Sequence, residues 1–206
     1  MPKIITISRQ FGSGGRELGK RLSEALGVPC YDQQIIEMVA KEQGLDQNYV
    51  AHMSENDFSA AYPATIARGF IAPNYALQQS VQISAAQHRL IRELAQKGDC
   101  VVIGRCADTV LEDFHPLNIF VYADQASKLA RCRKRAPVDE HLTDKEMVRK
   151  MKRIDKKRTE YRRMFAAGEW GRKENYHLCI NTSGKEIKKL VPGVLAYVKI
   201  WFGENE

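Results

Sequence analysis

The chain has 206 residues, with 32 lysines and arginines against 25 aspartates and glutamates, a formal net charge of +7. Hydrophobic residues make up 44% and charged residues 28%, which is ordinary for a globular protein and excludes a disordered chain. This length supports one domain over residues 1–206, or a core domain that carries insertions.

The chain opens as a strand, a glycine-rich turn and a helix. Residues 3–8 form an apolar run rich in β-branched side chains, which predicts a buried parallel strand. The turn Gly12-Ser13-Gly14-Gly15, called the glycine loop below, follows. Residues 16–26 then place apolar side chains on one helical face, and Gly27 is a natural stop.

The rest of the chain alternates in the same way. Further strands are predicted at 28–31, 100–104, 118–122 and 177–181, and helices at 33–43, 75–97, 123–135, 143 to about 165, and 185 to about 201. Apolar strands alternating with helices predict an α/β fold, a doubly wound five-stranded parallel sheet with helices on both faces. Ligands of such sheets bind where the strands end.

The glycine loop lies at such an end. Small residues between a strand and a helix expose backbone N–H groups that cradle phosphate, although a tight turn without a ligand has the same composition. The standard pattern G-x-x-x-x-G-K-[ST] is not met. Aligning the glycines puts Arg9 at the position of the first glycine and Gly15 at that of the lysine, with Arg16 one residue later.

Two charged residues follow other strands. Asp32 comes directly after the second strand, where it can cap the next helix or bind a nucleotide base or hydroxyl. Arg105 follows the third strand, where a guanidinium can bind phosphate with two hydrogen bonds. The alternative for Arg105 is a structural ion pair with Asp108.

The positive charge is concentrated in one stretch. Residues 128–163 hold 15 basic and 6 acidic residues, a net +9, while the remainder of the chain is −2. In the helix that begins near 143, Arg158 lies on the same side as Met151 and Ile154, with Asp155 beside this stripe. Inward charges need partners, either each other or a phosphate. Arg131, Arg133 and Arg135 could close over the same anion, whereas most other lysines and arginines fit a solvated face.

Other features point to a cytoplasmic protein. The N-terminal residues show no long apolar segment with a cleavage-like site, and no apolar run approaches the ~20 residues that cross a bilayer. A scattered, odd set of cysteines without zinc spacing suits free thiols in a reducing compartment. These are Cys30, Cys100, Cys106, Cys132 and Cys179.

Together these strings resemble a known family. The chain resembles the cytidylate kinase-like branch of the P-loop nucleoside monophosphate kinases, nearly from end to end. The resemblance rests on residues 7–15 (ISRQFGSGG), 31–32 (YD), 102–105 (VIGR), 155–158 (DKKR) and 175–183.

The resemblance implies two insertions and a set of site residues. Residues 33–97 would form a helical monophosphate-binding insertion, and 133–165 a basic lid. The donor phosphates of ATP, used with Mg²⁺, would lie on Gly12, Ser13, Gly14, Gly15, Arg16 and Glu17, with Asn181 and Thr182 near the donor base. The acceptor would meet Asp32, Arg105 and Asp108. The catalytic set would be Arg16, Arg131, Asp155 and Arg158, and no residue is predicted as a direct metal ligand.

One departure is serious. The family's lysine spans the β- and γ-phosphates and its Ser/Thr binds Mg²⁺, and neither is present here. Phosphoryl transfer depends on positioning and on charge, so Arg16 and lid arginines could substitute.

The predicted function is therefore a kinase that moves the γ-phosphoryl group of ATP to a nucleoside monophosphate, CMP- or dCMP-like, or to a similar small acceptor. The missing lysine motivates an alternative, a nucleotide-binding regulator without catalysis. The +9 segment motivates a third, a nucleic-acid-binding protein, which few nearby aromatic residues and no RNA-recognition motif support. No membrane partner and no particular oligomeric state is predicted.

Overall fold

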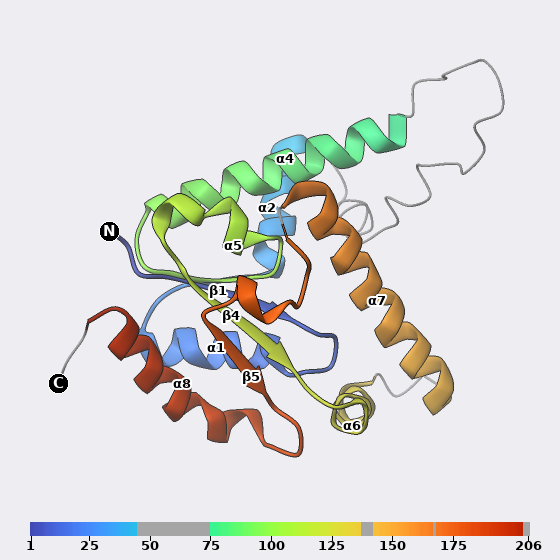
Figure 1. Ribbon diagram of the computed structural model, residues 1–206. Helices are drawn as coiled ribbons and strands as arrows, with labels where there is room; N and C mark the ends of the chain where they lie inside the picture. The colour runs from blue at the N-terminus through green and yellow to red at the C-terminus, as the bar shows by residue number, and fades with distance from the viewer. Residues whose placement is uncertain (45–74, 137–141, 167, 204–206) are drawn as a thin grey trace.

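The computed structural model describes residues 1–44, 75–136, 142–166 and 168–203. Its centre is one sheet of five parallel strands in the order β2-β3-β1-β4-β5 (Figure 1). The strands are β1 (Ile4–Arg9), β2 (Cys30–Tyr31), β3 (Cys100–Ile103), β4 (Leu117–Tyr122) and β5 (Leu178–Asn181). The predicted five-stranded parallel sheet is confirmed.

β1 occupies the middle of the sheet. It pairs with β3 from Ile4↔Cys100 onward and with β4 from Ile5↔Leu117 onward. Five of its six residues are buried, as expected for a strand covered on both faces. The loop that follows β1 therefore leaves the sheet at the centre of its carboxyl edge, between the ends of β3 and β4.

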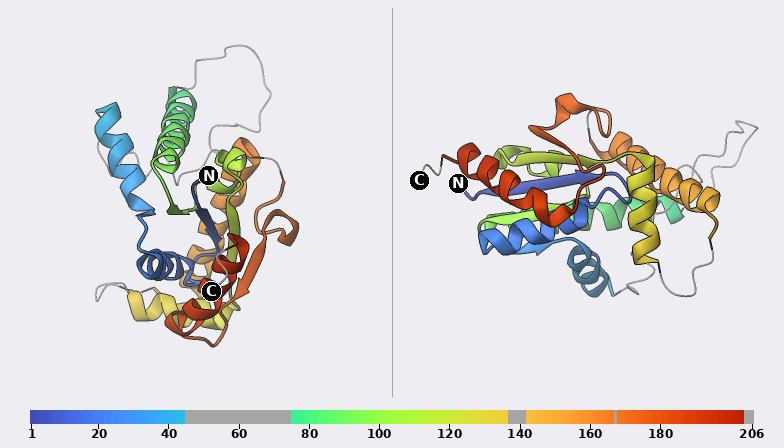
Figure 2. Two further views of the ribbon diagram at one scale, coloured as in Figure 1. Left: turned by 90° about the vertical axis from the view of Figure 1, so that its left-hand side faces the viewer. Right: turned by 90° about the horizontal axis from the view of Figure 1, so that it is seen from below.

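Helices cover both faces of the sheet, which confirms the doubly wound arrangement (Figures 1 and 2). On one face lie α1 (Gly15–Leu26) and α8 (Ile187–Trp201). On the other lie α2 (Gln33–Gln43), α4 (Tyr75–Gln96) and the short α5 (Ala107–Val110).

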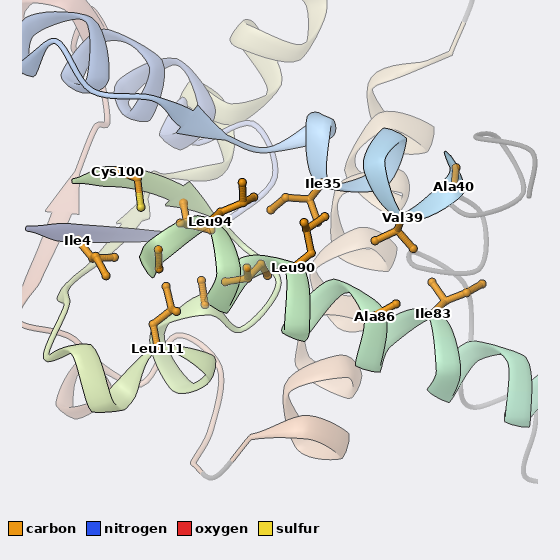
Figure 3. Close-up of a cluster of buried hydrophobic side chains, with 14 residues drawn as sticks. Ile4, Ile35, Val39, Ala40, Ile83, Ala86, Leu90, Leu94, Cys100 and Leu111 are labelled. Atoms are coloured by element: carbon orange, nitrogen blue, oxygen red, sulfur yellow. The ribbon is translucent and has the colours of Figure 1, made fainter. Parts of the chain in front are cut away.

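Each face has its own apolar cluster. The α4 face joins Ile4 and Cys100 of the sheet to Leu90 and Leu94 of α4, and α2 adds Val39 on the outer side (Figure 3). The α1 and α8 face joins other strand residues to both of these helices. Burial of this kind contributes about 25 cal/mol per Å² of apolar surface to the stability of the fold.

Two further helices lie at the carboxyl edge, α6 (Gln125–Arg135) and α7 (Asp144–Phe165) (Figure 1). Asp124 caps α6 by accepting a hydrogen bond from the Ser127 N–H. Thr143 and Glu146 form a reciprocal capping box at the start of α7. These caps fix where the two basic helices begin.

The structure differs from the sequence prediction in detail. β1 extends to Arg9, and β2 is only two residues long. α5 and two 3₁₀ turns, Glu112–Phe114 and Lys173–Asn175, were not predicted.

The two predicted insertions are covered only in part. Within 33–97 the structure describes α2 and α4, whereas residues 45–74 lie outside the described residues. Within 133–165 it describes the last residues of α6 and the whole of α7, whereas residues 137–141 lie outside the described residues. In the part of the chain that is described, no helix has both the length and the apolar character needed to cross a membrane.

Candidate functional site

The glycine loop connects β1 to α1 at the centre of the carboxyl edge. Gly12 and Gly14 have φ values of +76° and +84°, in the left-handed region that favours glycine. Gly14 is the N-cap residue of α1, and a side chain there would overlap Ile187 of α8. The N-terminus of α1, with the partial positive charge of its dipole, is thus placed where the strands end.

The hydroxyl of Ser13 is used inside the loop. This side chain is fully buried, donates to the Gln10 carbonyl oxygen at 2.8 Å, and accepts from the Gly15 N–H at 3.4 Å. Ser13 therefore uses its hydroxyl to shape the loop.

The loop is tied down on its β5 side. The Arg131 guanidinium donates to the carbonyl oxygens of Gly12 (3.5 Å), Ser13 (3.4 Å), Thr182 (2.5 Å) and Lys185 (3.0 Å). The Thr182 hydroxyl donates to the Ser13 carbonyl oxygen at 2.6 Å. Arg131, predicted to be catalytic, and Thr182, predicted to bind the cofactor, thus both hold the loop in shape.

Asn181, the other residue predicted near the donor base, lies at the end of β5. Its side-chain oxygen accepts from the N–H of Ser183 at 3.0 Å and from the Ser183 hydroxyl at 2.6 Å. It closes the turn that leads toward α8.

Two residues that sequence reasoning missed connect the loop to β4 and α6. The Gln10 side-chain oxygen accepts from the Ala123 N–H at 3.4 Å and from the Lys128 ammonium at 3.1 Å. The Lys128 carbonyl oxygen would lie 3.0 Å from a Cβ on Gly12. Lys128 therefore places a positive charge next to the glycine loop.

The opposite side of the loop is rich in arginine. Asp32 lies at the N-cap position of α2, but its side chain makes no capping hydrogen bond. Instead it pairs with the guanidinium of Arg16 and with that of Arg9, the latter at 3.7 Å. Arg9 is a third residue that the sequence prediction missed. The sequence signal that could have identified it is a positively charged residue at the end of the strand that leads into the glycine loop.

α7 contributes Asp155 and Arg158 to the same place. The Asp155 carboxylate accepts from the Phe11 N–H at 2.8 Å and from Arg158 at 3.0 Å. Arg158 also donates to the Arg9 carbonyl oxygen at 2.9 Å. Burial raises the pKa of Asp155, and the nearby Arg158, the Phe11 N–H and Lys128 oppose that change. The predicted inward pair on this helix thus contacts Arg9 and Phe11, which lead from β1 into the glycine loop.

Arg105 reaches the site through an unusual turn. Gly104, Arg105 and Cys106 have φ values of +79°, +57° and +52°, and the last two are positions where side chains cost energy. Such strain persists where surrounding structure fixes it, often at a binding site. The turn places Arg105 close enough to repel Arg9 electrostatically.

The charges in this cluster do not balance. Among the described residues that form it, four arginines (Arg9, Arg16, Arg105 and Arg158) meet two aspartates (Asp32 and Asp155). Burial, and then repulsion from Arg158, lowers the pKa of Arg9 to about 9, although Asp32 opposes that shift. The imbalance favours binding of an anion with more than one negative charge.

Asp108 lies elsewhere. It forms a buried ion pair with Arg162 of α7 at 2.5 Å, and no ion pair with Arg105 is found among the described contacts. It also lines a cavity of ≈ 530 Å³ together with Pro116, Asn118 and His177, which lie near the amino ends of β4 and β5. Asp108, predicted to bind substrate, is thus not brought to the glycine loop.

Glu17 also turns away from the loop. Its carboxylate pairs with Arg21 at 2.9 Å and with Arg135 of α6. Glu17, Asp32 and Asp155 each pair with an arginine, and within the described residues no group of three or more His, Cys, Asp or Glu side chains is placed to hold a metal ion. Mg²⁺ commonly keeps several waters and is held by substrate phosphates, so it would enter with a nucleotide.

The structure therefore separates the predicted residues into three groups. Those brought together around the loop are Gly12, Ser13, Gly14, Gly15, Arg16, Asp32, Arg105, Asp155 and Arg158. Arg131, Thr182 and Asn181 support the loop or the turn behind it. Asp108 and Glu17 pair with arginines outside it.

A five-stranded parallel sheet with a glycine loop between β1 and α1 is the fold of P-loop kinases. Residues 4–184 match the cytidylate kinase-like family, and the chain belongs to that family. No curated protein matches the chain.

Solved structures agree on the fold. An uncharacterized protein from Eubacterium ventriosum ATCC 27560 is 25% identical with a TM-score of 0.70, over 96% of this chain and 98% of that one. A shikimate kinase from Bacteroides thetaiotaomicron is 13% identical, with a TM-score of 0.54 and coverage of 98% and 99%. A gluconokinase from Sinorhizobium meliloti 1021 is 14% identical, with a TM-score of 0.53 and coverage of 99% and 98%.

Proposed function

We propose that the protein transfers the γ-phosphoryl group of ATP to a nucleoside monophosphate, such as CMP or dCMP, or to a similar small phosphate-bearing acceptor. The observation that carries this proposal is the surplus of positive charge beside the glycine loop, where Arg9, Arg105 and Arg158 converge. A phosphate dianion would balance it. Membership of the cytidylate kinase-like family supports the same reaction class.

In this proposal the two sides of the site bind different phosphates. The donor phosphates lie on the backbone of the glycine loop and the N-terminus of α1, which favour anions. The acceptor lies on the β3 and β2 side, where Arg105 binds its phosphate and Asp32 keeps Arg16 and Arg9 in place.

The reaction is an in-line displacement. An oxygen of the acceptor phosphate bonds to the γ-phosphorus, and the bond from that phosphorus to the β–γ bridging oxygen breaks. The bonding electrons leave with ADP. Charge on the transferred group is spread over its equatorial oxygens, which the arginine cluster stabilises. When bound with ATP, Mg²⁺ neutralises part of the phosphate charge.

The third hypothesis, a nucleic-acid-binding protein, loses support from local pairing. Arg133 pairs with Asp144 at 2.6 Å, and Arg135 pairs with Glu17. These charges on α6 are already offset by neighbouring carboxylates, which weakens a polyanion-binding surface there.

Coupled measurement of ADP release tests the proposed function. The acceptors are CMP, dCMP, UMP, AMP and GMP, with shikimate and gluconate as acceptors that carry a carboxylate and no phosphate. We expect stimulation by at least one monophosphate and none by the two carboxylates. ATP binding without stimulation by any acceptor would instead favour a nucleotide-binding regulator, and absence of ATP binding would contradict both.

The role of Arg105 is tested by Arg105→Ala. Loss of a charged hydrogen-bond donor is expected to raise the acceptor KM about 10- to 100-fold and to leave ATP affinity near normal. Arg172→Ala is the control, because Arg172 is 61% exposed and forms an ion pair with Glu174, away from the glycine loop. An unchanged acceptor KM would remove Arg105 from this role.

A further inference from the structure

Position 15 is where the usual loop pattern carries its lysine, and the structure shows why glycine stands there. Gly15 is in the first turn of α1, and its φ is not in the left-handed region. Its backbone therefore accepts any residue. A Cβ on Gly15, however, would lie only 2.5 Å from the Cβ of Arg9, the nearest atom, and 3.1 Å from both the Arg9 Cγ and the Val121 Cβ. The stem of Arg9 occupies the space that a lysine at position 15 would need.

A second glycine makes room for the other end of the same side chain. Gly104 follows β3, and a Cβ there would overlap the Nη1 atom of Arg9. The Arg9 side chain thus runs from the start of α1 across to the end of β3. Its guanidinium lies between the glycine loop, which would hold the donor phosphates, and the residues Arg105 and Asp32 on the acceptor side.

Arg9 is poorly neutralised in this place. Among the described residues its ion-pair partner is Asp32 at 3.7 Å, and Arg16 binds the same carboxylate. Arg158 donates to the Arg9 backbone and adds another positive charge nearby. The side chain is only 19% exposed, so water screens these charges weakly. A phosphoryl group between the donor and acceptor sides would relieve the repulsion.

We infer that Arg9 supplies the phosphate-binding cation that the loop lacks at position 15. The usual pattern has a glycine at position 9 and a lysine at position 15, whereas this chain has the cation at position 9 and the glycine at position 15. This inference rests on the proposed function, since it assigns the residue that holds the transferring phosphoryl group of ATP. It explains how a loop without the lysine can still bind a triphosphate.

The direct test measures ATP affinity by titration calorimetry. Arg9→Gln is expected to weaken ATP binding about 10- to 100-fold, the loss of a hydrogen-bonding charge. Arg9→Lys keeps the charge and is expected to recover part of the affinity. The control Arg172→Gln, at an exposed and paired position, is expected to bind ATP like the wild type. Equal ATP affinity of Arg9→Gln and the wild type would overturn the inference.

The exchange itself is tested by a second set of variants. Arg9→Gly alone is expected to lose ATP affinity, and Gly15→Lys alone is expected to lose it because the lysine meets the Arg9 stem. The double variant Arg9→Gly/Gly15→Lys restores the usual arrangement and is expected to bind ATP at least tenfold more tightly than Arg9→Gly. A folded double variant that binds ATP no better than Arg9→Gly would overturn the inferred exchange of cation and glycine. If the double variant does not fold, the ATP affinities of Arg9→Gln and Arg9→Lys decide whether Arg9 binds phosphate.

Failure of this inference and failure of the proposed function have different signatures. A wild type that binds ATP but shows no acceptor-dependent ADP release contradicts the transfer reaction, while the affinity ratio of wild type to Arg9→Gln still decides the role of Arg9. Normal transfer by Arg9→Gln contradicts the role of Arg9 and leaves the transfer reaction standing. A wild type that does not bind ATP contradicts both.

Discussion

Arg158 and Arg162 lie one turn apart on the inner side of α7, in opposite surroundings. Arg162 is 5% exposed and faces the equally buried Asp108, so each charge has its own counter-charge. Arg158 is 25% exposed and shares Asp155 with the backbone N–H of Phe11, just before the glycine loop and beside Arg9. A buried one-to-one pair holds two elements together, whereas a group in which arginines outnumber carboxylates is a candidate place for an anionic ligand.

The same difference divides the two sides of the glycine loop. On the β5 side Arg131 is surrounded by carbonyl oxygens that accept its hydrogen bonds. On the β3 side Arg9 faces one shared carboxylate and three other arginines. The first arrangement is a scaffold, and the second is the side on which we propose that phosphates bind.

The largest expected effect comes from breaking the matched pair. Arg162→Ala leaves Asp108 buried without its counter-charge, which is expected to lower the free energy of unfolding by about 3–5 kcal/mol. Denaturant unfolding measures this change. The double variant Arg162→Met/Asp108→Leu removes both charges and is expected to recover most of the stability. If the double variant is no more stable than Arg162→Ala, the loss of stability in Arg162→Ala does not come from the unpaired charge of Asp108.

A smaller effect is expected on the scaffold side of the loop. Arg131→Gln removes charged hydrogen bonds to the loop carbonyl oxygens and is expected to cost about 2 kcal/mol of unfolding free energy. Arg133→Gln, in which an exposed ion pair with Asp144 is lost, is the control and is expected to cost less than about 1 kcal/mol. Equal losses in the two variants would contradict the scaffold role of Arg131.

The smallest effect is a pH dependence from Asp155. Because burial raises the pKa of this carboxyl above its ordinary 3.8, the folded protein holds the proton more tightly than the unfolded chain. The resulting stabilisation is present below pH 3.8 and is lost as the pH rises through the raised pKa. Asp155→Asn, which does not ionise, is expected to become more stable relative to wild type over that rise. The free energy of unfolding of both proteins is measured across this pH range. A difference between them that does not change with pH would contradict the prediction.

Much of the fold could be predicted from the sequence, because short β-branched runs alternate with helical patterns and leave few other topologies. The five parallel strands, the glycine loop and the inward position of Arg158 followed from such patterns, whereas the order of the strands in the sheet did not. The short α5 did not, because it begins after two residues with positive φ, Arg105 and Cys106, that no periodicity announces.

The site was harder to predict, because its contacts join residues far apart in the chain. The partner of Asp108 is Arg162, 54 positions away, rather than the neighbouring Arg105. The position of Arg9 depends on Gly15 and Gly104, which lie near it only in the folded chain. The role of Arg131 depends on carbonyl oxygens, which sequence composition does not reveal.

The central claim is that the arginines beside the glycine loop, where four arginines meet two aspartates, bind the phosphates of a nucleotide. ATP affinity measured by calorimetry for Arg158→Gln and Arg133→Gln tests it most directly, because both variants remove one arginine from the same basic segment. The account predicts at least tenfold weaker binding for Arg158→Gln and wild-type binding for Arg133→Gln, whose charge is paired with Asp144. Equal ATP affinities for the two variants, whether weakened or unchanged, would contradict it.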